Sequence, residues 1–306
     1  MTNFKRIAVI MGGLSGEREV SLSSGQGIVE ALTRKGYEVQ GIDLTADIES
    51  FVRELKAFKP DVVFNALHGV YGEDGCVQGL LNLMKIPYTH SGVLASAIGM
   101  NKEKTRQIAN QVGISIAKGG LYSKAHFEKD SFPMPFVAKP NADGSSIGVV
   151  IVRTEEEKAA LLESWADDEY KLIEEYIPGH ELAAAALNDE FLGIVEIIPK
   201  SGFYDYENKY TEGGARHVVP APIPEAIQQL VADYTLKIHK TLGCRGVSRS
   251  DFRYDDTNPS VPRVIFLEIN TNPGMTPLSL VPDIAKSKKI AYDDLVEKLI
   301  KEAQCD

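Results

Sequence analysis

The chain has 306 residues, of which 43% are hydrophobic, and this length is enough for two or three compact domains. Its 43 Asp and Glu outnumber its 33 Lys and Arg, which gives a formal net charge of -10. Such a surface disfavours nucleic acid as a partner, because that binding depends on basic patches that neutralise phosphates. No apolar run in the sequence is long enough to span a bilayer, so we expect no membrane association.

The N-terminus and the cysteines predict a cytoplasmic protein. The apolar stretch at residues 7–11 runs into a glycine turn without a small-residue cleavage site, which predicts a first β-strand instead of a signal peptide. The three cysteines, Cys76, Cys244 and Cys305, are odd in number and lack metal-type spacing. We therefore expect reduced thiols.

The first third of the chain alternates apolar strands with amphipathic helices. Strands are expected at 7–11, 38–42 and 62–65, and helices at 20–34 and 48–58. This rhythm predicts a doubly wound parallel sheet with helices on both faces and ligands beyond the carboxyl ends of the strands. Glycine-rich turns follow the first and third strands, but neither matches a dinucleotide fingerprint or a P-loop.

The remainder predicts a smaller α+β unit followed by further mixed structure. Residues 87–119 have a helical pattern, with one helix opening at Asn101-Lys102 and running through 111. The range 136–187 is β-rich with one helix at 155–165, and 201–220 has no clear period, which is typical of a functional or disordered loop. A helix at 224–242, two strands, and helices near 282–285 and 292–303 complete the chain.

One C-terminal segment, R-V-I-F-L-E-I-N-T-N-P-G-M-T, predicts a metal site. Glu268 and Asn270 are two residues apart at the end of a strand and therefore share one face. Asp251 lies on a similar strand upstream, and oxygen ligands of this kind suit a hard ion such as Mg2+. A strand with solvated polar ends explains either piece alone. Together with the glycine-rich segment that begins at Lys139, the metal interpretation is favoured.

Two further segments are suited to a nucleotide. Lys139 ends a strand before a loop containing Gly144, Ser145 and Ser146, whose backbone N–H groups can surround phosphate oxygens. An ordinary β-hairpin is the alternative. Later, K-L-I-E-E-Y-I-P-G-H-E-L reads as strand, linker and strand, which can present backbone groups to adenine and the carboxylate of Glu181 to a ribose. A structural hairpin is the more usual explanation of such a segment.

Four charged or polar side chains occupy positions that indicate substrate binding or catalysis. Glu17 follows the first strand, where a carboxylate can receive an ammonium group, and His68 occupies the equivalent place after the third strand. Surface and structural roles are the alternatives for both. Arg249 shares a strand face with Asp251, which suits charge stabilisation in a transition state. Lys102 opens a helix, and a solvated cap residue is the usual alternative.

In this order, K-P with G-S-S-x-G, E-x-x-x-x-G-x-E, R-x-D and E-x-N-x-x-P-G-M-T resemble the ATP-grasp superfamily. With G-G-x-S-x-E-R-E-V-S-L, H-G-x-x-G-E-D-G, F-Y-D-Y-E-x-K-Y and S-L-V-P, the resemblance narrows to the D-alanine–D-alanine ligase family. It covers essentially the whole chain, and the motifs are specific as a set.

The resemblance implies an architecture of α/β and α+β parts. An N-terminal doubly wound parallel-sheet domain, residues 1–100, precedes a two-part ATP-grasp domain, residues 101–306. The central α+β subdomain spans about 115–188, and the C-terminal metal and substrate subdomain spans about 189–306. The implied cofactors are ATP, held between these subdomains, and two Mg2+ or Mn2+ ions.

The resemblance also assigns roles to residues of this sequence. It assigns ATP binding to Lys102, Lys139, Ser146, Glu174, Glu175, Ile177, Glu181 and Lys209. It assigns catalysis to Glu17, Ser145, Tyr210, Arg249, Gly274 and Ser279, and substrate binding to Glu17, His68, Arg249, Gly274, Ser279 and Leu280. It assigns the metals to Asp251, Glu268 and Asn270.

The implied reaction joins two D-alanine molecules through an acyl phosphate, for peptidoglycan precursor synthesis by a homodimeric bacterial enzyme. The nearer alternative is a ligase for D-Ala-D-Ser or D-Ala-D-lactate, and Tyr210 argues against D-lactate. The farther alternative is a non-catalytic ATP-binding module, against which intact Arg249, Glu268 and Asn270 argue.

Overall fold

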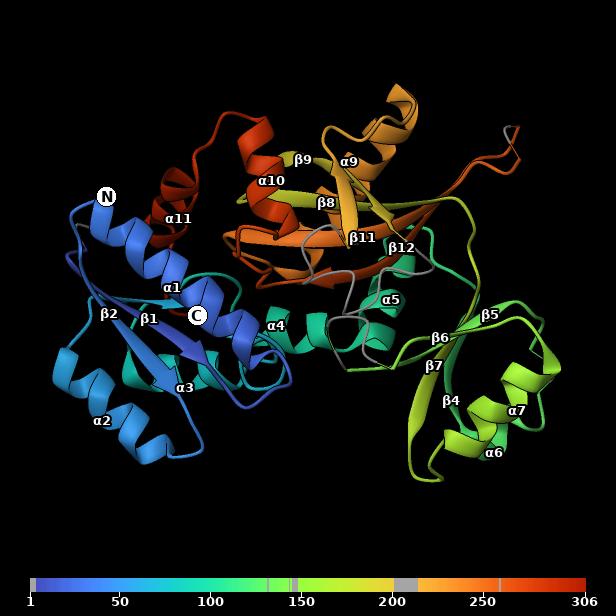
Figure 1. Ribbon diagram of the computed structural model, residues 1–306, viewed down its shortest axis with the longest axis horizontal. Coiled ribbons are helices and arrows are strands. Elements are labelled where there is room, and N and C mark those ends of the chain that lie inside the picture. Colours follow the sequence, from blue (N-terminus) through green and yellow to red (C-terminus); the bar gives the residue numbers. More distant parts are fainter. Residues whose placement is uncertain (1–3, 131, 143, 145–147, 201–213, 259) are drawn as a thin grey trace.

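The computed structural model describes residues 4–130, 132–142, 144, 148–200, 214–258 and 260–306. These residues form three sheets with helices packed around them (Figure 1). The strands of the first sheet are β1 (Arg6–Gly12), β2 (Glu38–Leu44) and β3 (Val62–Asn65), and its helices are α1 (Arg18–Arg34), α2 (Ile48–Phe58) and α3 (Cys76–Met84). No described helix is long and apolar enough to cross a bilayer.

The N-terminal sheet is parallel, in the order β2-β1-β3, and its two faces are buried by different helices. Alternate residues of β1 explain this, because Ile7 and Val9 pack in a cluster with α1, whereas Ala8 and Ile10 pack with α2 and α3. The predicted helices on both faces are therefore confirmed. The third helix, α3, was not predicted, because its nine residues follow directly on a glycine turn.

Two short helices connect this sheet to the rest of the chain. They are α4 (Val93–Met100) and α5 (Lys102–Gln111), and the side chain of Asn101 accepts a hydrogen bond from Lys104 N at 3.0 Å. Asn101 is therefore the N-cap of α5, as the Asn101-Lys102 pair predicts. This cap sets the start of α5, so that Lys102 is its first residue.

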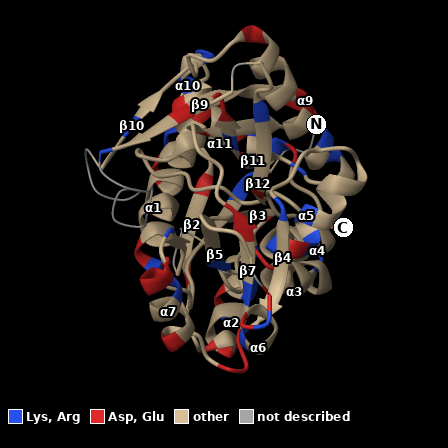
Figure 2. Ribbon diagram, turned by 90° about the vertical axis from the view of Figure 1, so that its right-hand side faces the viewer, with Lys and Arg blue, Asp and Glu red and all other residues tan. Residues whose placement is uncertain are grey.

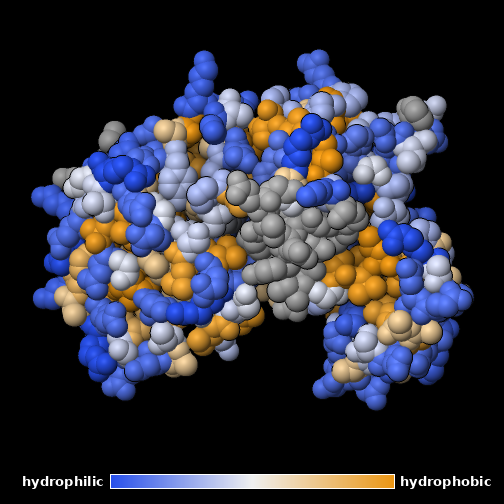
Figure 3. Space-filling model, viewed as in Figure 1, coloured by the Kyte–Doolittle hydropathy of each residue, from blue (hydrophilic) through white to orange (hydrophobic). Residues whose placement is uncertain are grey.

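The second sheet is antiparallel, in the order β4-β7-β5-β6. Its strands are β4 (Gly119–Ser123), β5 (Phe136–Pro140), β6 (Val150–Val152) and β7 (Tyr170–Glu175), and its helices are α6 (Lys124–Phe127) and α7 (Glu155–Ser164). Trp165 and the aromatic rings of Phe127 and Phe136 form a separate core between this sheet and its helices. In space filling, this unit projects from the rest of the molecule and leaves a hollow beside it (Figure 3).

The third sheet is antiparallel, in the order β10-β9-β8-β11-β12. It contains β8 (His180–Leu187), β9 (Glu190–Pro199), β10 (Ala215–Val218), β11 (Val247–Asp255) and β12 (Arg263–Asn270). The helices α9 (Glu225–Leu242), α10 (Leu280–Ser287) and α11 (Tyr292–Lys301) follow the predicted order. β10 corrects the interpretation of 201–220 as aperiodic throughout, because its four residues pair with β9.

The hairpin considered for K-L-I-E-E-Y-I-P-G-H-E-L is wrong. Its two strands, β7 and β8, belong to different sheets, and residues 176–179 cross between them. Gly179 permits this crossing, because it has a φ of +88° and a Cβ there would lie 2.2 Å from Tyr254 O of β11. β8 is the central strand of the third sheet although its residues fall in the predicted central subdomain, and the proposed domain boundaries stay a prediction.

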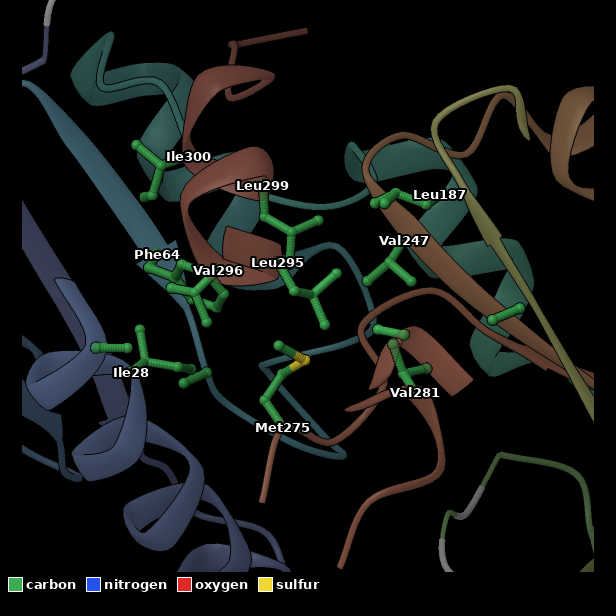
Figure 4. Packing of buried hydrophobic residues seen from close by; sticks show 14 of the residues in the cluster. Ile28, Phe64, Leu187, Val247, Met275, Val281, Leu295, Val296, Leu299 and Ile300 are labelled. Atoms are coloured by element: carbon green, nitrogen blue, oxygen red, sulfur yellow. The ribbon is translucent and has the colours of Figure 1, made fainter. Parts of the chain in front are cut away.

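One hydrophobic cluster joins the N-terminal sheet to the C-terminal elements. Figure 4 shows Phe64 of β3 and Ile28 of α1 near Leu295 and Val296 of α11, with Val247 of β11 on the other side. All five side chains are 0% exposed. Because such packing is dense and each buried side chain is held by its neighbours, the N-terminal crevice is fixed relative to the third sheet.

Buried His90 makes the stability of this junction sensitive to acid. Its ring packs edge-on against Phe64, and burial lowers its pKa to about 3, with a smaller effect from the charge of His68. An unfolded histidine takes up a proton near its ordinary pKa of about 6.5. Between these values the unfolded chain binds more protons than the folded one, so stability falls as pH falls.

We expect His90→Asn to remove this acid sensitivity, since Asn tolerates the φ of +69° at this position. Between pH 7 and pH 5, the free energy of unfolding should fall by about 2 kcal/mol more in the wild type than in the variant. Denaturant titrations at the two pH values measure this difference. Equal losses in the two proteins would show that His90 titrates normally in the fold.

Candidate functional site

A pocket lies where the carboxyl ends of β1 and β3 face the ends of β11 and β12. Its lining comes from the N-terminal unit, the α4–α5 connection, the glycine-rich loop and the third sheet. The residues are Glu17, His68, Glu73, Gly99, Met100, Lys102, Gly144, Glu181, Ile197, Arg249, Asp251, Glu268, Ile269, Asn270, Thr271, Gly274, Leu278, Ser279 and Leu280. Residues predicted from distant segments therefore meet in one place.

The predicted metal ligands lie side by side on two paired strands. Asp251 of β11 is directly opposite Glu268 of β12, and Arg249 is opposite Asn270. Directly opposite residues of an antiparallel pair project from the same face, so Asp251, Glu268 and Asn270 share it. Two carboxylates and one amide oxygen fit a hard divalent cation. Among the described residues, no group of three His, Cys, Asp or Glu side chains has metal-binding geometry.

Two cations balance these carboxylates. Arg249 donates from Nε to Asp251 Oδ1 at 2.8 Å and from its terminal nitrogen to Oδ2 at 2.9 Å. Lys102 Nζ lies 3.3 Å from Glu268 Oε2. The bidentate contact holds the guanidinium in a fixed plane at the pocket. Positive and negative groups thus lie next to one another in the pocket. Over the described parts of the whole chain, Lys and Arg are likewise interspersed with Asp and Glu (Figure 2).

Glu17 lies at the N-terminal end of α1 and is only 8% exposed. Two glycines let the backbone approach its carboxylate. A Cβ at Gly69 would lie 3.1 Å from Glu17 Oε2, and a Cβ at Gly144 would lie 2.8 Å from the same oxygen. The glycine-rich loop therefore reaches the crevice of the first sheet, which brings the predicted phosphate segment next to the predicted ammonium site.

His68 is buried in a chain of polar contacts. Its Nδ1 lies 3.2 Å from Glu73 Oε1, and its Nε2 lies 3.3 Å from Ser24 Oγ. Ser24 Oγ in turn accepts a hydrogen bond from Met275 N at 3.4 Å. Burial raises the pKa of Glu73, and the charge of Glu17 adds to this, whereas His68 and Arg249 oppose it. The chain of contacts connects the first sheet to the loop after β12.

The loop after β12 is held by its own polar groups. Asn272 donates from Nδ2 to Leu67 O at 2.8 Å, and its N–H donates to Asn270 Oδ1 at 2.8 Å. Gly274 lies against Ser279, since a Cβ there would be 2.9 Å from Ser279 Oγ. Leu280 begins α10 and is buried. This loop therefore presents its backbone to the pocket at a position where a side chain would interfere.

The phosphate lysine predicted on β5 is held by a carboxylate of β7. Lys139 Nζ lies 2.5 Å from Glu174 Oε2 at the end of β7, and both residues are buried. Neither lines the pocket described above. The loop itself joins antiparallel β5 and β6, so the hairpin alternative describes its topology.

The side chains in and around the linker between β7 and β8 differ in what they contact. The carboxylate of Glu175 accepts from Lys118 N at 3.1 Å and from Arg263 at 2.7 Å, and Ile177 is buried. Both side chains are therefore held by protein contacts, and the linker backbone is partly held as well, since Glu175 N donates to Lys118 O at 2.8 Å and Ile177 O accepts from Arg253 at 3.1 Å. Glu181, on β8, lines the pocket, and Arg253 donates to its Oε2 at 3.3 Å.

Four predicted site residues fall outside the described part of the chain: Ser145, Ser146, Lys209 and Tyr210. Conversely, two polar residues of the site were not predicted from the sequence. Glu73 contacts His68 and belongs to the glycine turn after β3, and Asn272 belongs to the loop after β12. Both lie in motifs that the sequence predicts to be functional, but their contact partners are visible only in the fold.

Comparison with known proteins gives concordant results. The family model described as D-ala D-ala ligase C-terminus matches residues 109–301, and the one described as D-ala D-ala ligase N-terminus matches residues 6–60 and 45–91. The chain is similar to a D-alanine–D-alanine ligase of Paramagnetospirillum magneticum, with 49% identity over 99% of each chain. It is also similar to one of Parvibaculum lavamentivorans, with 47% identity over 100% of each.

Solved structures agree with these sequence matches. The crystal structure of D-alanine–D-alanine ligase from Bacillus anthracis complexed with ATP is 33% identical in sequence and has a TM-score of 0.83. The match covers 98% of this chain and 97% of that one. Since the coverage is nearly complete in both directions, the similarity extends to the whole arrangement of the three sheets.

Proposed function

This chain belongs to the D-alanine–D-alanine ligase family, and we propose that it joins two D-alanine molecules to D-alanyl-D-alanine in an ATP-dependent reaction. The products besides the dipeptide are ADP and phosphate. The observation that carries the proposal is the pocket itself. It combines an oxygen-donor pair, Asp251 and Glu268, with Arg249 and with the Glu17 crevice of the first sheet.

In the first step, a carboxylate oxygen of one D-alanine attacks the γ-phosphorus of ATP, and ADP leaves. Glu17 receives the ammonium group of this D-alanine, and His68 lies beside it in the same crevice. Lys102 and Lys139 balance the charge of the phosphates, which is the main protein contribution in phosphoryl transfer. Asp251, Glu268 and Asn270 would hold two Mg2+ or Mn2+ ions, which when bound supply further charge neutralisation.

In the second step, the amine of the other D-alanine attacks the acyl carbon, and phosphate leaves. The carboxylate of this second molecule is bound near Ser279 and Leu280, at the start of α10. Arg249 and the N–H of Gly274 stabilise the oxyanion that forms on the acyl group. The chain needs no covalent nucleophile, because orientation and charge stabilisation are sufficient.

The adenosine moiety of ATP is bound by the linker between the second and third sheets. Backbone groups around Glu174, Glu175 and Ile177 contact the base, and Glu181 contacts the ribose. The side-chain contacts of Glu175 with Arg263 and Lys118 support this division, because they orient the linker without using a group that the base needs. From the sequence alone, we assign Ser146 and Lys209 to the nucleotide, and Ser145 and Tyr210 to catalysis.

We also propose that the dipeptide serves peptidoglycan precursor synthesis in the cytoplasm and that the enzyme is a homodimer. The test of the reaction is product identification by mass spectrometry, with D-alanine, D-serine and D-lactate competing as the second substrate. We expect D-alanyl-D-alanine as the main product. A predominance of D-Ala-D-Ser or D-Ala-D-lactate would assign the chain to a different specificity on the same scaffold.

A further inference from the structure

A buried arginine outside the proposed site contacts the carboxylate that holds Lys139. Arg106 lies on α5, is 2% exposed, and has its Nε 2.7 Å from Glu174 Oε1. The N–H direction does not satisfy hydrogen-bond geometry, so this contact is an ion pair. The other oxygen of the same carboxylate, Oε2, contacts Lys139 Nζ. One carboxylate is therefore shared between two buried cations.

The remaining contacts of Arg106 fix its guanidinium. One terminal nitrogen lies 2.8 Å from Glu103 Oε2, one turn earlier on α5, and the other donates to Ala117 O at 2.6 Å. The four charged groups of the cluster are Arg106, Lys139, Glu103 and Glu174, and their charges sum to zero. Buried charges are costly unless they are balanced in this way.

We propose that Arg106 is a positioning residue that adjusts how strongly Glu174 holds Lys139, and thereby sets the affinity for the phosphates of the nucleotide. This inference rests on the assignment of Lys139 to the phosphates under the proposed function. An ammonium held by a carboxylate has less attraction left for a phosphate oxygen. Because Arg106 also pairs with this carboxylate, Glu174 attracts Lys139 less strongly, and Lys139 can attract a phosphate oxygen more strongly.

The ion pair also connects two elements that carry or adjoin the phosphate lysines. Arg106 is one turn beyond Lys102 on α5, and Glu174 ends the strand that leads into the linker. The ion pair of Arg106 with Glu174 therefore ties the helix that carries one phosphate lysine to the strand beside the other. Its loss should affect the nucleotide and leave the D-alanine sites, which are formed by other elements, unchanged.

The test is Arg106→Met, measured as the KM for ATP, the KM for D-alanine, kcat and the affinity for ADP by calorimetry. We expect the KM for ATP and the Kd for ADP to rise about tenfold. A change of this size is small compared with the interaction energy of two neighbouring buried charges. The KM for D-alanine should stay within about twofold. Arg34→Met is the matched control, because Arg34 forms a bidentate pair with Asp293 on the surface.

A second variant separates positioning from packing. In Arg106→Met/Glu174→Gln the carboxylate that restrains Lys139 is also neutral, so the Kd for ADP should fall back toward the wild-type value. A role of Arg106 in packing alone would make the double variant as weak as the single one or weaker, and that result would overturn the proposal. An unchanged Kd for ADP in Arg106→Met would also overturn it.

Two controls keep the outcomes distinct. If Arg106→Met does not fold, Arg106→Gln replaces it in both variants, since its amide can still donate to Ala117 O, and the same two results are expected. Wild-type protein that fails to form ADP from ATP and D-alanine would contradict the proposed function. Active wild type with nucleotide affinity insensitive to Arg106 would contradict only the role of Arg106.

Discussion

Glu268→Gln is expected to lower the rate of dipeptide formation by at least about 100-fold, more than is typical for residues that only support a metal ligand. Glu268 is opposite Asp251 on the paired strand and within 3.3 Å of Lys102. An amide is almost the same size as the carboxylate, so the fold should persist while a negative ligand is lost. The loss should be largest when Mg2+ is limiting.

The measurement is the initial rate as a function of Mg2+ concentration, accompanied by calorimetric titration with Mn2+. Glu297→Gln is a matched control, because Glu297 is a partly exposed residue of α11 that contacts Lys35 and Lys301 outside the pocket. Normal turnover of Glu268→Gln at limiting Mg2+ would show that the metal assignment is wrong.

Arg249→Met is expected to lower kcat by about 10² to 10³, which is typical for the loss of one oxyanion donor. The structure adds a second consequence, because Arg249 also makes the bidentate contact with Asp251. Arg249→Lys keeps the charge but not the planar fork, and it should recover only part of the rate. If only the KM for ATP changes in Arg249→Met, the residue binds nucleotide and does not stabilise the oxyanion.

Steady-state kinetics with each substrate varied separately distinguish these outcomes. The Mg2+ dependence of Arg249→Met should be measured in the same series, since an altered Asp251 would shift it. A kcat loss that persists at saturating Mg2+ is expected if the guanidinium acts on the reacting group. A loss that disappears at high Mg2+ would assign the effect to Asp251.

Much of the fold could be predicted because local periodicity decides it. The helix at 48–58 and the strand at 62–65 have the predicted bounds, since the apolar residues of the first recur at helical spacing and those of the second form a short continuous run. The pairing of the strands is harder to predict from the sequence, because it depends on contacts between distant segments. β7 and β8 are four residues apart but lie in different sheets, and the close approach of Gly179 to Tyr254 O that separates them is a tertiary contact.

The same distinction applies to the site. The two-residue spacing of Glu268 and Asn270 predicts a shared face, and the pairing of Asp251 with Glu268 completes it. Arg106 could not be predicted, because in the polar helix K-E-K-T-R-Q-I-A-N-Q an arginine reads as a solvated charge. Its burial results from tertiary contacts, in which Glu174 of β7 provides the opposite charge and Ala117 O accepts a hydrogen bond.

In the proposed route, a carboxylate of D-alanine attacks ATP to form an acyl phosphate. The most direct measurement uses D-alanine labelled with 18O in both carboxylate oxygens, with mass spectrometry of the released phosphate and of the dipeptide. We expect one 18O in each phosphate, ADP as the other nucleotide product, and one phosphate for each D-alanyl-D-alanine. Unlabelled phosphate, or AMP with pyrophosphate, would contradict this route.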